Sequence, residues 1–323
     1  MDLRQLGYMV AIAEEGGFTS AAERIGISQP SLSYAIKALE NELGALLFHR
    51  LGRSVRPTAA GEALLGPARQ ALRDAEVARA AVAAVAGLAD GRLDLVCLPT
   101  LAVDPMAGLV GRFRIDHPGM RVRIDEPEDA DAVADAVRSG VSELGLTELP
   151  ARRGGPSRAG RTDDLESIEL GTHEFVAVLP PDLAIGSSAD SGADDHTPLP
   201  LRTLARLPLV TTPLGTSTRR QIDEAFGAAG LVASLAVETD HRESIIAMVR
   251  AGAGVSIVPA PLAASSRLGD VVVRPLTPRI ERKIGLVRRS GPLSPAAQAF
   301  VSLAVPGTPA RPPRPRARRR PVR

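Results

Sequence analysis

Several residue types are scarce in this 323-residue chain. Tryptophan is absent, aromatic residues make up 2% of the sequence, and the only cysteine is Cys97. A single cysteine excludes a disulfide within the chain, which suits a reducing compartment. Because Cys97 lies in the apolar run 95–98, we expect a small buried strand residue rather than a redox sensor, which needs an exposed thiol of low pKa.

Long apolar runs are also missing. None approaches the roughly 20 residues of a membrane-spanning helix. The N-terminus lacks a basic region followed by an apolar stretch and a cleavage site. We therefore expect a soluble, cytoplasmic protein with no membrane partner. Apolar residues still make up 44% of the chain, so Leu, Val, Ile and Ala can form the cores of two or three compact units.

Charge is unevenly distributed along the chain. The formal net charge is +2, but seven arginines and no acids lie within 311–323, which leaves −5 for the remainder. We interpret residues 304–323 as a disordered Pro/Arg tail, either an inert extension or a non-specific nucleic-acid contact. Within residues 1–58, six basic residues balance six acidic ones. DNA binding by this segment would depend on where its cations lie.

The first 58 residues show the pattern of a winged helix-turn-helix. Apolar stripes predict three helices, over about 3–14, 20–25 and 29–43, with glycines at their ends. We expect Thr19 or Ser20 to cap the second helix, where Ser20 and Glu23 match a capping box, and Ser28 to cap the third. Residues 46–57 predict a short hairpin, or wing, with an arginine-rich tip.

The exposed face of the third helix and the wing provide the candidate DNA contacts. Glutamine can form two hydrogen bonds with adenine, serine can contact a base or a phosphate, and lysine prefers guanine or phosphate. Wing arginines suit the DNA backbone or the minor groove. An ordinary solvated surface is the alternative for each residue alone. The candidates are Gln29, Pro30, Ser31, Ser33, Tyr34, Lys37, Arg50 and Arg53.

A long alanine-rich linker helix is predicted over residues 59–88, capped by Thr58. Such a helix needs a partner to be stable, and we expect a second copy of the chain to provide it. Pro67 predicts a kink or a boundary. A heptad seam can be drawn through Leu65, Ala68, Leu72, Ala75, Arg79, Val82 and Ala86.

Beyond residue 91, short apolar runs alternate with amphipathic segments. This alternation predicts an α/β domain with a largely parallel sheet, and two clusters of strands suggest two subdomains. The stretches 152–164 and 182–200 are rich in Gly, Ser, Pro and charge, so we expect loops there.

A ligand site in such a domain is expected where strand C-termini face helix N-termini. Hydroxyls and free helix N–H groups there suit a small polar or anionic ligand, although a threonine that merely caps a helix or ends a strand is the alternative. Arg219 is one candidate clamp for a carboxylate. The candidate effector-binding residues are Thr100, Leu101, Glu126, Pro127, Thr147, Thr211, Thr212, Pro213 and Thr239.

Enzymatic motifs are not found. The sequence has no Gly-x-Ser-x-Gly elbow and no phosphate-binding Gly-x4-Gly-Lys. Gly252 and Gly254 lack the third glycine of a dinucleotide loop, so we expect them to permit close packing. The five histidines are scattered without metal-binding spacing. We expect no catalytic site, metal or cofactor. The alternative is an α/β small-molecule-binding protein or enzyme with an accessory helical domain.

Residues 1–66 resemble the LysR-type transcriptional regulators. The resemblance is carried by the segments 3–6, 13–19, 21–24, 28–33, 36–40, 42–44, 47–48, 50, 52–53 and 57–62, and further segments at 176–180, 252–259 and 292–296 extend it to about residue 303. Tyr34 departs from the long polar or basic residue usual at its position. Gly7 replaces a helix former, and the 182–200 loop and the tail are also atypical.

The resemblance implies a DNA-binding regulator with an operator and a small-molecule effector as partners. Its fold would be an N-terminal all-α winged helix-turn-helix (1–58), a linker helix (59–88) and an effector domain (91–303). The effector domain would resemble type 2 periplasmic binding proteins. Subdomain I would comprise 91–162 and 268–303, subdomain II would comprise 163–267, and the effector would bind between them. Linker helices would pair into dimers, and dimers into tetramers.

Overall fold

The N-terminal segment folds into three helices and a hairpin. The computed structural model describes residues 1–51, 54–85, 91–150, 165–183, 197–265 and 271–305. Apolar residues of all three helices meet in one core with the hairpin and the linker helix, which confirms the winged helix-turn-helix. The elements are α1 (Leu3–Glu15), α2 (Phe18–Ile25), α3 (Gln29–Leu43) and the antiparallel strands β1 (Phe48–Leu51) and β2 (Ser54–Pro57).

The helix caps agree with the sequence at α3 but not at α2. Ser28 accepts a hydrogen bond from the Ser31 backbone N–H, as expected. At α2 the expected serine or threonine cap is wrong, because Gly17 is the N-cap and Ser20 lies inside the helix. The Ser20 hydroxyl donates to the Gly17 carbonyl at 3.2 Å. Phe18 starts the helix and is buried in the core, so packing outweighs the preference of serine for a cap.

A single long helix, α4 (Ala59–Val85), follows the hairpin. The Gly61 N–H donates to Thr58 Oγ1 at 3.0 Å, which is the expected cap. Pro67 lies inside the helix and does not end it. The last predicted linker residues, 86–88, lie outside the described part of the chain.

Part of the predicted heptad seam of α4 packs against the N-terminal core of the same chain. Leu65 and Ala68 are buried in the N-terminal core, and Leu72 packs against that core. In contrast, Val82 is 71% exposed. Leu65 and Ala68 are therefore occupied within the chain, whereas Val82 is available for contact with a second copy.

The remaining chain is built on a mixed sheet in the order β4-β3-β5-β12-β6-β11-β7, with β10 also paired to β6 and a separate parallel pair β8-β9. The strands are β3 (Gly91–Cys97), β4 (Met120–Asp125), β5 (Leu144–Glu148), β6 (Glu166–Leu179), β7 (Leu199–Pro200), β8 (Pro208–Thr211), β9 (Ser234–Glu238), β10 (Ser256–Pro259), β11 (Val272–Thr277) and β12 (Glu281–Arg288).

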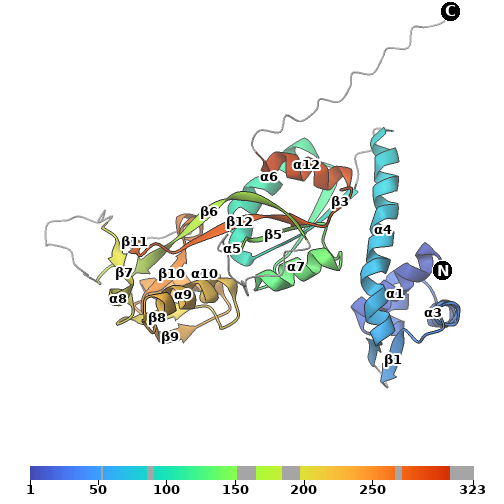
Figure 1. The fold of residues 1–323 in the computed structure, drawn as a ribbon, viewed down its shortest axis with the longest axis horizontal. Coiled ribbons are helices and arrows are strands. Elements are labelled where there is room, and N and C mark those ends of the chain that lie inside the picture. The colour runs from blue at the N-terminus through green and yellow to red at the C-terminus, as the bar shows by residue number, and fades with distance from the viewer. Residues whose placement is uncertain (52–53, 86–90, 151–164, 184–196, 266–270, 306–323) are drawn as a thin grey trace, which may run out of the picture.

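The expectation of a largely parallel sheet holds only in part. β3 is parallel to β4 and β5, but β12 pairs antiparallel with both β5 and β6. The strand β12 runs beside the first part of the long strand β6, from Glu166 to Glu174, in the middle of the effector half (Figure 1). Sequence periodicity found only the second part of β6, because its first part is mostly polar and half-exposed.

The helices are α5 (Pro99–Leu101), the wide turn η1 (Ala102–Met106), α6 (Ala107–Asp116), α7 (Ala130–Arg138), α8 (Leu201–Leu204), α9 (Ser217–Ala228), α10 (Arg242–Arg250), α11 (Ala260–Ser265) and α12 (Pro295–Ala304). We call described residues 91–150 and 284–305 the first lobe, and described residues 173–280 the second lobe. In Figure 1, α6, α7 and α12 lie at the first lobe, and α9 and α10 at the second.

Each lobe has its own apolar interior. The first lobe packs around Leu95, Phe113 and Phe300. The second has two clusters, one including Phe175 and Phe226 and the other Val210 and Val258. The strands β6 and β12 connect these separate interiors. Among the described residues, no helix is both long and apolar enough to cross a membrane.

Candidate functional site

Helix α3 presents predicted DNA contacts on an exposed side. Pro30, Ser31, Tyr34 and Lys37 are exposed, whereas the core-facing residues of the helix are buried. The spacings of three and four residues place these side chains on neighbouring positions of one helix surface. Tyr34 is 78% exposed, so its ring is accessible to a partner at the position where the resemblance predicts a long polar or basic side chain.

Two further predicted contacts are bonded to each other at the start of α3. Gln29 Nε2 donates to Ser33 Oγ at 2.9 Å, and both residues are half-buried. The Ser31 and Ser28 hydroxyls share a hydrogen bond of 2.7 Å. These bonds order the polar groups of the first turn before any base is contacted, which reduces the entropy lost on binding.

The hairpin is anchored to the helices on both sides. The Leu47 N–H donates to Glu40 Oε1 at 2.8 Å, and the Val55 N–H donates to the Gly16 carbonyl at 3.0 Å. Arg50 is paired with Val55 in the hairpin register. The Arg50 side chain and the whole of Arg53 lie outside the described part of the structure.

A cavity of about 610 Å³ lies between the two lobes. The first lobe contributes Thr100 and Glu126, which were predicted, and Glu128. The second lobe contributes residues of α10 and its approach, among them Asp240 and Arg242. The C-terminal ends of the neighbouring parallel strands β3 and β4 thus open into this cavity, as expected for an α/β ligand site.

A smaller cavity of about 10 Å³ continues from the same wall. Thr100 lines both cavities, and the predicted residues Thr211 and Thr212 line the smaller one together with Ser256. Thr211 Oγ1 and Ser256 Oγ are buried and have no hydrogen-bond partner in the described chain. Unpaired buried hydroxyls are uncommon in proteins and indicate a place where a ligand or water is bound.

The structure adds Arg282, which the sequence analysis did not single out. Arg282 lies on β12, is 3% exposed, and donates from Nη2 to Thr100 Oγ1 at 2.6 Å. Its guanidinium carbon lies 5.4 Å from the centre of the Phe175 ring, while Nε and Nη1 have no partner among the described residues. Burial, with a smaller contribution from Arg242, lowers the pKa of Arg282 to about 10.

Sequence reasoning misses Arg282 because only the strand pairing brings it to the site. Arg282 faces His173 across β12 and β6, and its hydrogen-bond partner Thr100 is 182 positions away in the sequence. Arg282 lies between Glu281 and Lys283, just before the apolar run 284–287, and a residue in such a charged segment is expected to be exposed. No local pattern distinguishes Arg282 from the exposed Arg279 nearby.

Other predicted effector residues are not brought to the two cavities. Leu101 is part of the apolar interior of the first lobe, and Thr147 is buried with Oγ1 unpaired. The Pro213 carbonyl accepts from Thr216 Oγ1, and Thr239 Oγ1 accepts from the His241 N–H. Pro127 is half-buried next to the cavity residues Glu126 and Glu128.

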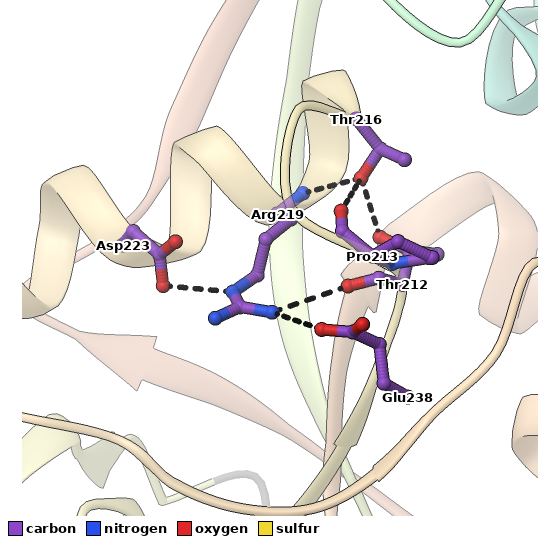
Figure 2. A network of polar contacts seen from close by, with 6 residues as sticks. All are labelled: Thr212, Pro213, Thr216, Arg219, Asp223 and Glu238. Atoms are coloured by element: carbon purple, nitrogen blue, oxygen red, sulfur yellow. Dashed lines mark hydrogen bonds and ion pairs between the residues drawn. The ribbon is translucent and has the colours of Figure 1, made fainter.

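Arg219 is occupied by other protein groups (Figure 2). Its Nε donates to Asp223 at 2.9 Å, and its Nη1 donates to Glu238 at 3.0 Å and to the Thr212 carbonyl at 3.4 Å. The Arg219 N–H also donates to Thr216 Oγ1 at the start of α9. The arginine therefore fixes α9 to β8 and β9, and it is poorly placed to clamp a free carboxylate.

Polar contacts join the two lobes across the cavity. Arg242 of the second lobe pairs with Glu128 of the first. Arg220 pairs with the buried carboxylate of Glu148, which also accepts from Ser217 Oγ at 2.8 Å. These contacts hold the lobes in the arrangement that the structure shows.

Cys97 is buried at the end of β3, as expected. Burial, together with the negative charge of Glu126, raises the pKa of the Cys97 thiol to about 12. A thiol of such a pKa is almost entirely protonated at neutral pH. It is therefore a poor nucleophile.

Comparisons with known proteins agree on one family. Residues 3–62 match the "Bacterial regulatory helix-turn-helix protein, lysR family", and residues 67–307 match the "LysR substrate binding domain". The chain belongs to the LysR family of transcriptional regulators. It is therefore a DNA-binding transcriptional regulator with an effector domain. This supports the main prediction over a binding protein or enzyme with an accessory helical domain.

Among LysR-family relatives, the chain is 31% identical to the HTH-type transcriptional regulator IlvR of Caulobacter vibrioides, covering 94% of this chain and 97% of IlvR. It is 33% identical to a probable hydrogen peroxide-inducible genes activator of Mycobacterium avium, with 87% and 86% covered.

Solved LysR-family structures show the same architecture over nearly the whole chain. A full-length OxyR variant from Pseudomonas aeruginosa has a TM-score of 0.70 at 27% identity, covering 94% of this chain and 93% of that one. Full-length CbnR in complex with its target DNA has a TM-score of 0.61 at 25% identity, with 94% and 99% covered.

Proposed function

We propose that α3 reads the operator through Gln29, Pro30, Ser31, Ser33, Tyr34 and Lys37, with Arg50 and Arg53 of the wing on the flanking backbone. The observation that carries this proposal is the exposed polar face of α3 beside a hairpin anchored to the same core. Solved CbnR with its target DNA supports a DNA complex for this architecture.

We further propose that the cavity between the lobes binds a small polar or anionic effector. Thr100, Glu126, Thr211 and Thr212 contact it, and Arg282 acts through Thr100. A ligand that prefers one closure of the lobes shifts the population toward that closure. The shift would re-space the DNA-binding units and change how the DNA is bent.

The functional units proposed here are the DNA-binding domain (1–58), the linker helix (59–88) and the effector domain (91–303), in a cytoplasmic homodimer that pairs into a tetramer. The sequence places the division of the effector domain at 91–162 with 268–303, and 163–267. The apolar clusters shift these boundaries, because Leu165 packs in the first lobe and Val271 and Leu276 pack in the second. The tail predicted at 304–323 lies outside the described residues except for Ala304, which ends α12, and Val305.

One relative is named a probable hydrogen peroxide-inducible genes activator, but this chain lacks the features of a cysteine-based peroxide sensor. A thiol sensor needs an accessible cysteine of low pKa, often with a resolving cysteine nearby. Cys97 is the only cysteine, it is buried, and its pKa is raised to about 12. We therefore propose reversible effector binding in place of cysteine oxidation.

The role of α3 is tested by Gln29→Ala in the full-length protein. DNA selected from fragmented genomic DNA gives the binding site, and affinities are then measured for every single-base change in it. Loss of a two-bond contact should relax the preference at one position by about 1–3 kcal/mol. Gln298→Ala, on the exposed surface of α12, is the control and should change nothing. If Gln29→Ala keeps the same base preference at every position, α3 does not recognise the operator through Gln29.

A further inference from the structure

The inner end of the cleft holds polar groups without partners. Thr211 and Ser256 are 1% and 0% exposed, both line the small cavity, and neither hydroxyl forms a hydrogen bond with the described chain. Leaving a buried hydroxyl unpaired is unfavourable. The small cavity has room for about one water-sized atom, so a single oxygen atom of a ligand could pair with both hydroxyls.

Positive charge lies close to these hydroxyls. Arg242 lines both cavities, and its Nε has no partner although its Nη atoms contact Glu128. Arg282 donates to Thr100, which also lines both cavities, and keeps two N–H groups unpartnered. Hydroxyl and guanidinium donors together suit a carboxylate, which accepts several hydrogen bonds at once.

The outer part of the cleft has the opposite charge. Four acidic residues line the larger cavity, against only two arginines, Arg242 and Arg250. Glu128 is paired with Arg242, and Glu243 lies 3.6 Å from His241. Glu126 and Asp240 form no hydrogen bond or ion pair with any described residue. This part of the cleft therefore disfavours a simple anion and favours a cationic group.

The two charge environments are close enough for one small molecule to reach both. Val96 of β3 is paired with Asp125 of β4, so Thr100 and Glu126 follow neighbouring parallel strands at the same edge of the sheet. Both residues line the same cavity. A ligand whose carboxylate lies near Thr100 has its other end within the acidic part of that cavity.

We propose that the effector is a zwitterion of the amino-acid type. One oxygen of its carboxylate lies inward on the hydroxyls of Thr100, Thr211 and Ser256, the rest of the molecule lies in the larger cavity, and its ammonium group lies outward against Glu126 and Asp240. This inference rests on the proposed function of the cleft and adds the chemical class of the ligand.

The test is calorimetric titration of the full-length protein with ω-amino acids from glycine to 6-aminohexanoate. Each is compared with the carboxylic acid and the amine of the same length. We expect one or more of these amino acids to bind about fivefold tighter than both matched compounds, the gain typical of a partly exposed ion pair. Equal or tighter binding of the acid or the amine, or no binding of any amino acid, would overturn the inference.

Variants of the cleft test separately the contacts made by the two ends of the ligand. Glu126→Gln should weaken binding of the amino acid, because it removes the attraction for the ammonium group. It should strengthen binding of the matched acid, because it removes the repulsion of the carboxylate. Glu224 is an exposed carboxylate of α9 outside the cavity. Glu224→Gln should leave the ratio of the two affinities, amino acid over matched acid, unchanged. A ratio that is the same in Glu126→Gln as in the wild type contradicts the assigned orientation.

A third variant distinguishes failure of this inference from failure of the proposed function. Thr211→Val keeps the side-chain shape and removes one inner hydroxyl. It should therefore weaken the binding of every carboxylate ligand. If Thr211→Val weakens binding but amino acids have no advantage, only the zwitterion inference fails. If ligands bind with no dependence on Thr211, the assignment of the effector site to this cleft fails as well.

Discussion

Arg282 and His173 face each other where β12 and β6 pass between the lobes. His173 Nε2 lies 3.1 Å from Asp104 Oδ2, while His173 Nδ1 and two nitrogens of Arg282 have no partner among the described residues. Buried polar groups with unused hydrogen-bonding capacity are unfavourable for stability alone. Arg282 is joined to the cleft through its hydrogen bond to Thr100, which agrees with the binding role proposed for it.

His173 should make the protein less stable in mild acid. Burial and the charge of Arg282 lower the pKa of His173, although Asp104 partly opposes this. In the unfolded chain histidine takes up a proton below about pH 6.5, so the unfolded state binds more protons and stability falls as pH decreases through this range. The free energy of unfolding of wild type minus His173→Gln, measured by urea titration, should therefore decrease from pH 7 to pH 5.

Asp104→Asn provides the matched variant for His173. Asp104 is the group that raises the pKa of His173, so without its carboxylate this pKa should be lower still. The decrease in the free energy of unfolding from pH 7 to pH 5 should therefore be larger. A wild-type minus His173→Gln difference that stays constant or increases toward pH 5 would contradict the assigned environment of the imidazole.

The contact between α1 and α4 shows how closely two elements can approach. A Cβ atom on Gly7 of α1 would lie 3.8 Å from Leu72 Cδ2 of α4, an ordinary contact. A Cβ atom on Gly61 of α4 would lie 2.2 Å from the Leu47 carbonyl oxygen, which is backbone and cannot move aside cheaply. Glycine is thus required at position 61 and is replaceable at position 7.

Gly7→Ala and Gly61→Ala should therefore have opposite effects, although each adds one methyl group. Gly7→Ala should stabilise the N-terminal domain by about 1 kcal/mol through helix propensity. Gly61→Ala should destabilise it by about 1–3 kcal/mol through overpacking. Native-state hydrogen exchange of the α1 amides in the full-length protein measures both changes. Effects of the same sign would show that α4 does not pack on α1 and on the Leu47 backbone in this way.

At the scale of the whole molecule, the two lobes and the linker helix form a continuous structure. Glu128–Arg242 and Glu148–Arg220 join the lobes, and α4 contacts α12 of the first lobe. Burial and the neighbouring Arg289 lower the pKa of Arg73 of α4 to about 10. A change in lobe closure can therefore be transmitted to α4, which also packs against the DNA-binding core.

Local sequence patterns predict much of this architecture and little of its inner site. The helices of residues 1–58 and most strands follow apolar periodicity, because each buries one face. The β6–β12 pairing is non-local and includes polar residues, so periodicity does not find the first part of β6. The same pairing places Arg282 beside Thr100, and Leu101 turns into the interior where a cleft residue was expected.

The central claim is that a dimer of this regulator places two copies of α3 in successive major grooves of a specific site. Hydroxyl-radical footprinting of the full-length protein on the DNA that it selects tests this directly. We predict two protected half-sites on one face of the duplex, about one helical turn or a small multiple of it apart. Protection spread evenly along the DNA, or confined to a single half-site, would contradict the account.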